Sequence, residues 1–121
     1  MMMRAAGLIL ALALGACAAQ AQTPPRLDGD WVVDLSTEPG TPYTRPMQLA
    51  LHADGTVTGS FYESEIQAGR WRTDRGRTCV SFRTTDGVGP YHSAACLVGD
   101  HVEGQTWAEH RNFLFNWNAV R

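Results

Sequence analysis

Hydrophobic and polar residues alternate in short runs along most of this 121-residue chain. Glycine, proline or aspartate separates the runs at intervals of about 8 to 12 residues, which is typical of an all-β barrel or sandwich. No helical period of comparable length follows residue 26. The runs predicted to be strands are 31–35, 46–52, 56–62, 67–73, 77–84, 91–98, 101–108 and 113–120.

The connections between the predicted strands are of two kinds, which alternate along the chain. The tight turns, each with a glycine, are 53–55, 74–76 and 99–100, and the longer connections are 36–45, 63–66, 85–90 and 109–112. In an up-and-down meander alternate connections lie at the same end, so one end should be closed and the other open. We therefore predict an all-β fold, an eight-stranded antiparallel up-and-down β-barrel, whose interior holds side chains or one small ligand.

The fifth and sixth predicted strands allow a check of which face each side chain takes. The loop at 85–90 pairs Thr84 with Tyr91, which places Cys79 directly opposite Cys96. Such a pair can bring two β-carbons within disulfide reach, so a Cys79–Cys96 disulfide is predicted on the outer face. Two free thiols in a redox or metal site are the weaker alternative, because no C-x-x-C motif is present. The residues predicted to point inward are Val80, Phe82, Tyr91, Ser93, Ala95 and Leu97.

The residues before 29 have the pattern of an export signal and a short linker. One positive charge at Arg4 precedes an unbroken run of small and apolar residues at 5–16, and prolines follow at 24 and 25. The run is too short for a membrane-spanning helix, which needs roughly 20 apolar residues. We expect an exported protein with a linker at 22–28 and a single barrel domain at 29–121.

Two processing sites compete within the signal. Ala19-Gln20-Ala21 is an A-x-A cleavage motif, which would remove 1–21 and release a free periplasmic or secreted protein. Leu14-Gly15-Ala16-Cys17 is similar to a bacterial lipobox, where 1–16 would be removed and Cys17 would carry lipid. Lipidation would leave an even pair of cysteines in an oxidising compartment. The expected location is the periplasm, or the outer membrane of a Gram-negative-type bacterium through a lipid anchor.

Charge and motif content narrow the classes of function. The formal net charge is −2, and the ten basic residues are all arginine without a long run of one sign, so nucleic acid is not an expected partner. The four histidines lack zinc-ligand spacing, and no G-x-S-x-G motif or phosphate-binding glycine loop occurs. We expect no enzyme activity, cofactor or metal. Asp86 and Glu109-His110-Arg111 are expected at the open rim, where an acid/base pair is the weaker alternative.

Several short motifs occur in the order in which they occur in avidin and streptavidin. They are Gly29-Asp30-Trp31 with Asp34-Leu35, Ala53 to Ser60, Tyr62-Glu63-Ser64, His92 to Ala95, Glu103 to Trp107 and Trp117-x-Ala119-x-Arg121. On these residues the chain resembles the avidin family within the wider calycin (lipocalin-like) group. In calycins a late arginine lies across the tryptophan of Gly-x-Trp at the closed end. The resemblance therefore implies a structural latch between Trp31 and Arg121, at the end where the turn pattern also places them.

The resemblance also implies a ligand site. Its residues would hydrogen-bond the ureido group of biotin, bind the carboxylate tail or wall the cavity, and they are Thr37, Tyr62, Ser64, Phe82, Ser93, Trp107 and Trp117. The family's counterpart of Trp117 is lent to a neighbouring subunit, which implies a homo-oligomer. An adjoining Phe61 implies a bulge or shift near Tyr62.

Other positions depart from the avidin pattern. Val33 replaces the asparagine that completes the ureido clamp, and Ala95 and Leu97 replace a threonine and a tryptophan. A missing partner leaves a polar ligand group buried and unpaired. We expect a non-catalytic, exported barrel with an incomplete biotin site and weak or altered binding of a biotin-like or other amphiphilic molecule. The alternative is a structural or enzyme-inhibitory cell-envelope protein with a self-filled barrel that acts through its loops.

Overall fold

The computed structural model describes residues 2–3 and 26–121, so the predicted export signal and Cys17 lie outside the described residues. One short 3-10 helix, η1 (Glu109–Arg111), accompanies the strands of this described part. The strands are β1 (Gly29–Asp34), β2 (Thr44–Leu51), β3 (Thr56–Phe61), β4 (Ser64–Glu65), β5 (Gln67–Asp74), β6 (Arg77–Thr85), β7 (Pro90–Val98), β8 (His101–Ala108) and β9 (Phe113–Val120).

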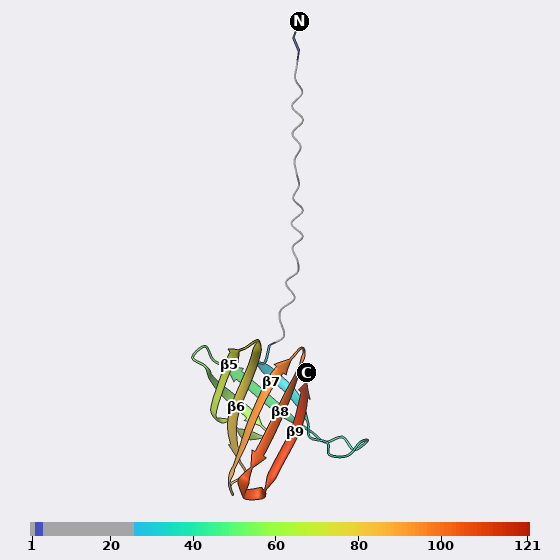
Figure 1. The fold of residues 1–121 in the computed structure, drawn as a ribbon, viewed down its shortest axis with the longest axis vertical. Helices are drawn as coiled ribbons and strands as arrows, with labels where there is room; N and C mark the ends of the chain where they lie inside the picture. The colour runs from blue at the N-terminus through green and yellow to red at the C-terminus, as the bar shows by residue number, and fades with distance from the viewer. Residues whose placement is uncertain (1, 4–25) are drawn as a thin grey trace.

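The strands form one closed antiparallel sheet (Figure 1). Each long strand pairs with the next one along the chain, and β1 pairs with β9 to close the wall. The two-residue strand β4 folds back on the end of β3 and does not form a separate strand of the barrel wall. The prediction of an eight-stranded up-and-down β-barrel is therefore confirmed.

The two ends of the barrel differ as the turn pattern predicts. The β2–β3, β5–β6 and β7–β8 turns lie at one end with the start of β1 and the end of β9. The other end carries the β1–β2, β3–β5, β6–β7 and β8–β9 connections, and Figure 1 shows η1 there, opposite the C-terminus. The β1–β2 connection extends away from the wall (Figure 1). The barrel thus has a closed end and an open end.

The register of β6 and β7 is the one that the sequence predicts. Thr84 pairs with Tyr91 and Cys79 with Cys96, and the two cysteines form a disulfide. Side chains alternate across the wall, so Val80 and Phe82 are buried while Ser81 and Arg83 are exposed. A period of two is what a sheet with one face in the core requires.

The hydrophobic core includes a residue that lies before the predicted start of the barrel domain at residue 29. Leu27, expected in a linker, is only 2% exposed and packs in the hydrophobic core with Trp31. The indole Nε1 of Trp31 donates to the carbonyl of Leu27 at 2.9 Å, and the backbone N–H of Leu51 donates to the carboxylate of Asp28 at 2.8 Å. Residues 26–28 therefore belong to the closed end of the barrel. Across residues 2–3 and 26–121, no helix has the length and apolar character to cross a membrane.

Candidate functional site

A cavity of about 660 Å³ opens between the connections at the open end of the barrel. Seven of its lining residues are aromatic or aliphatic, six are serine or threonine and three are charged. In that order they are Leu35, Tyr43, Phe61, Tyr62, Tyr91, Phe113 and Phe115; Thr37, Thr41, Ser64, Thr84, Thr85 and Thr106; and Glu38, Asp86 and Arg111. An apolar wall with a few convergent polar groups is the usual chemistry of a small-molecule site.

Strand alternation places the aromatic rings on the wall. Phe113 and Phe115, two residues apart on β9, stack with centroids 5.9 Å apart and planes 11° apart. Tyr91 of β7 meets Phe113 edge-on at 6.3 Å. Phe61, at the end of β3, contacts the buried rings of Phe82 at 5.4 Å and Trp117 at 5.2 Å. The cavity floor therefore rests on packed core.

Tyr43 and Tyr62 share a hydrogen bond between their hydroxyls at the cavity wall. The guanidinium of Arg45 lies over both rings, 4.8 Å from the centroid of Tyr43 and 5.2 Å from that of Tyr62. The hydrogen bond between the two hydroxyls is the largest cause that lowers the pKa of Tyr62 and the largest that raises the pKa of Tyr43. The two hydroxyls therefore act together as one polar point on the cavity wall.

The backbone at Tyr62 explains how this ring reaches the cavity. Phe61 pairs with Ser64, and Tyr62 and Glu63 between them both have positive φ, 53° and 61°. Two central residues with positive φ make a type I′ hairpin turn, which strongly favours Asn-Gly. The shift expected near Tyr62 is thus a tight turn, and the irregularity in register falls in β5 between Gln67 and Arg70. Strained backbone of this kind clusters at functional sites.

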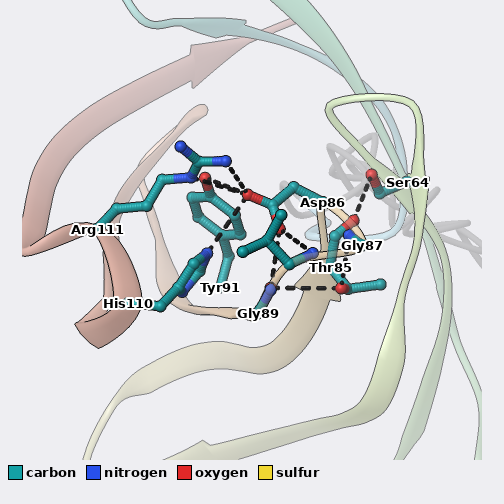
Figure 2. Close-up of polar contacts among 9 residues, drawn as sticks. Ser64, Thr85, Asp86, Gly87, Gly89, Tyr91, His110 and Arg111 are labelled. Atoms are coloured by element: carbon teal, nitrogen blue, oxygen red, sulfur yellow. Dashed lines mark hydrogen bonds and ion pairs between the residues drawn. The ribbon is translucent and has the colours of Figure 1, made fainter.

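Asp86 lies on the side of the cavity mouth opposite Tyr43 and Tyr62. It connects the β6–β7 connection with the β8–β9 connection. Its Oδ1 accepts the backbone N–H of Val88 at 2.8 Å and that of Gly89 at 3.0 Å. Figure 2 shows Tyr91, His110 and Arg111 converging on the same carboxylate, and Nε of Arg111 donates to Oδ2 at 2.8 Å. The backbone N–H groups, and then Arg111 and His110, hold the pKa of Asp86 far below its usual value.

A buried hydroxyl connects the cavity with the core beneath it. Thr106 lines the cavity, and its Oγ1 accepts the indole N–H of Trp117 at 2.9 Å. Ser93, 1% exposed, shares a hydrogen bond of 2.8 Å with the same hydroxyl. Within the described residues, no buried side-chain nitrogen or oxygen lacks a partner. Thr106 is therefore both a structural acceptor and a polar point on the wall.

The residues predicted to bind ligand fall into three groups. Thr37, Tyr62 and Ser64 line the cavity together. The second group is buried directly behind the wall and is made up of Phe82, Ser93 and Trp117. Trp117 is 3% exposed inside its own barrel, whereas the resemblance implied a ring lent to a neighbouring subunit. Trp107 forms the third group, because it lies on the outer face.

The position of Trp107 corrects the expectation that it walls the cavity. It is 38% exposed and stacks on the ring of His92, its cross-strand neighbour, at 5.7 Å. The physical reason is strand parity: Trp107 shares a face of β8 with Glu103, which pairs with the outward-facing Cys96. Thr106, the neighbour with the opposite parity, points inward instead.

The predicted latch lies at the closed end, away from the cavity. Cζ of Arg121 is 4.1 Å from the ring centroid of Trp31, and the guanidinium donates to the carbonyls of Arg26 and Asp28. A Cβ at Gly29 would lie 2.7 Å from the Arg121 guanidinium, so this close approach depends on glycine. These contacts fix the start of β1 and the end of β9 at the end of the barrel opposite the cavity.

Several cavity residues were not predicted from the sequence. Thr106, Phe113 and Phe115 needed only strand alternation and register, and the resemblance directed attention to Trp107 instead. Tyr43 lies in the β1–β2 connection, and Arg45, on the same face of β2 as the buried Met47, reaches over the rings of Tyr43 and Tyr62, contacts that no local pattern indicates. Across 2–3 and 26–121, no group of three or more His, Cys, Asp or Glu residues is arranged to hold a metal ion.

Comparisons of the chain with models of protein families, with curated proteins and with solved structures found no match. The closed eight-stranded antiparallel barrel is consistent with avidin-like and calycin barrels. The resemblance to avidin in particular rests on the short sequence motifs alone.

Proposed function

We propose that this barrel is a binding protein that captures a small, apolar-bodied molecule with a polar group through its open end. The observation that carries the proposal is the cavity of about 660 Å³ inside an eight-stranded wall. Barrels of eight strands are just wide enough to be filled by their own side chains or to hold one small ligand. A barrel filled by its own side chains would leave no cavity of this size.

The polar residues on the cavity lining support the proposal that the ligand carries a polar group. Tyr62 and Ser64 lie two residues apart in the chain at the type I′ turn, and both line the cavity with Thr37. These are the positions that resemble the ureido-binding residues of avidins. Val33, where avidins have an asparagine, is fully buried in apolar core. The proposed site therefore lacks one arm of the biotin clamp, and biotin itself is a weak candidate.

Thermal unfolding with a ligand panel tests the proposal. Biotin, small acids, amides and amphiphiles are added at millimolar concentration to the full-length protein, and Tm is followed. A ligand present at 100 times its Kd stabilises the fold by about 2.7 kcal/mol, which shifts Tm by several degrees in a domain of this size. A Tm that no ligand moves would contradict the proposal and favour a protein that acts through its loops.

Two tryptophan substitutions on β9 provide a matched control. Phe115→Trp enlarges a side chain on the cavity wall, whereas Leu114→Trp adds the same ring to the outer face, where Leu114 is 65% exposed. Phe115→Trp should weaken binding and Leu114→Trp should leave it unchanged. Equal effects of the two substitutions would place the ligand outside the barrel.

A further inference from the structure

We propose that the cavity selects a neutral molecule with a planar aromatic body and a hydrogen-bonding group, and that it discriminates against carboxylates. This inference rests on the proposed binding function and names its ligand class. It follows from the charges, rings and hydroxyls on the wall, taken in turn.

The guanidinium on the cavity lining is already paired with a carboxylate. Among the described residues that line the cavity, Arg111 is the one arginine, and it is 2.7 Å from Asp86 through Nη2 and donates to the same oxygen through Nε. The lining also carries Glu38, so two carboxylates face one guanidinium. A carboxylate that leaves water for this wall finds the lining guanidinium already paired, so its desolvation is not repaid.

A cationic ligand is also disfavoured, for a different reason. Aromatic faces attract cations, but Arg45 already lies over the rings of Tyr43 and Tyr62. Arg111 borders the cavity near Tyr91, and both contact Asp86. Glu38 is exposed, where an ion pair contributes little. Only a neutral ligand avoids both penalties.

The rings of the wall favour an aromatic body. Phe113 and Phe115 present two nearly parallel rings, and Tyr91 stands edge-on beside them. Aromatic rings gain from offset-stacked or edge-on contacts with another ring at about 4.5 to 7 Å between centroids. A flat ring can make both kinds of contact with this cluster.

The hydroxyls of the wall match a neutral polar group. Thr84 and Thr106 are buried and line the cavity from β6 and β8, and Ser64 lies on the same lining. Thr106 already accepts the indole N–H of Trp117 and Ser64 donates to the carbonyl of Thr85, so Ser64 adds an acceptor to the wall while Thr84 can both donate and accept. Together they can meet the carbonyl and the N–H groups of an amide, whereas a carboxylate offers only acceptors.

Three ligands with one ring system test the inference. They are 2-naphthylacetamide, 2-naphthylacetate and 2-(2-naphthyl)ethylamine, titrated calorimetrically into the full-length protein at pH 7. We expect the amide to bind at least about tenfold more tightly than the acid and the amine, a difference of about 1.4 kcal/mol. Tightest binding of the acid or the amine would overturn the inference.

Two variants change the charge preference in opposite directions. Glu38→Gln removes a carboxylate and should narrow the ratio between amide and acid affinity. Arg111→Gln leaves Asp86 without its guanidinium partner, so the ratio between amine and amide affinity should rise. Each ratio is measured within one variant, so a general loss of stability does not affect it. Ratios that stay at their original values would contradict the role of these charges.

The outcomes also separate this inference from the proposed function. If other ligands of the panel bind and none of the three naphthyl compounds does, the proposed ligand class is refuted and the proposed binding function stands. An absence of binding across the whole panel would refute both. Equal binding of cyclohexylacetamide and phenylacetamide would refute the aromatic body alone.

Discussion

The guanidinium of Arg121 lies over the indole ring of Trp31, with Cζ 4.1 Å from the ring centroid. It also donates to the carbonyl of Asp28 at 2.8 Å. The contacts connect the end of β9 with the chain that enters β1, where the barrel closes. The sequence predicted this pair, and the structure places it at the closed end.

Arg121→Gln should destabilise the fold by about 1–2 kcal/mol, since it removes a cation–π contact and hydrogen bonds to two backbone carbonyls. Urea denaturation measures the change in the free energy of unfolding. Arg77→Gln, on the exposed start of β6, is the control and should change it by less than about 0.5 kcal/mol. Equal stability of the two variants would show that the latch contributes nothing.

Thr106→Val should destabilise the protein more than Ser93→Ala. The valine leaves the buried indole N–H of Trp117 without an acceptor, which costs about 1–3 kcal/mol. In Ser93→Ala the indole keeps its acceptor, and the Thr106 hydroxyl can turn to water in the cavity. Thermal unfolding of the two variants checks the order. A Ser93→Ala variant that is the less stable of the two would reverse the assigned roles.

Glu63→Gly should stabilise the fold by a few tenths to about 1 kcal/mol. Glu63 has φ of 61°, a conformation that costs a residue with a Cβ about 1–2 kcal/mol. Glycine avoids this cost, but its larger conformational entropy in the unfolded state offsets part of the gain in stability. Glu65→Gly, in the adjoining strand β4, should have the opposite sign. Chemical denaturation distinguishes them, and a destabilised Glu63→Gly variant would mean that the turn is held by side-chain contacts.

The stability supplied by Asp86 should depend on pH. Its folded-state pKa is far below the ordinary value of about 3.9, so its contribution is present above about pH 5 and is lost as the pH falls through 4 and lower. The sign follows because below pH 4 the unfolded chain binds a proton that the folded state does not. The difference in unfolding free energy between the protein and Asp86→Asn should therefore shrink with acid.

Asp54→Asn is the control for this pH series. The pKa of Asp54 is also lowered, by hydrogen bonds from Thr56 at the closed end, so its contribution should also be lost in acid. Only Asp86→Asn should speed hydrogen exchange at the amides of Val88 and Gly89. A stability difference that stays constant from pH 7 to pH 2 would refute the linkage to Asp86.

The disulfide between Cys79 and Cys96 should contribute about 3 kcal/mol, because it closes a loop with a sequence separation of 17. A Cys79→Ala/Cys96→Ala variant should lose this amount in urea denaturation. Intact mass under non-reducing conditions should show the two cysteines linked. Alkylation of both thiols in the native protein would be incompatible with the pairing.

Local pattern was enough for the wall of the barrel. The period of two, the glycine-bearing turns and the loop at 85–90 predicted the strands, the closed end and the pairing of Cys79 with Cys96. Counting residues outward from the β7–β8 turn, as for the loop at 85–90, places Trp107 opposite the outward-facing His92. Trp107 was misplaced because the family resemblance was followed there in preference to register.

Local sequence pattern is sufficient for the fold, because alternation and turn chemistry act between neighbouring residues and between strands joined by short turns. The composition of the cavity depends instead on contacts made in three dimensions. Turn alternation predicted Asp86 and Arg111 at the same rim, but the contact between them, like that of Arg45 with Tyr62, depends on side-chain positions that no short-range rule gives. The cavity is lined by side chains of β3, β6, β7, β8 and β9 together with the connections at the open end, and how these side chains meet depends on their packing in three dimensions.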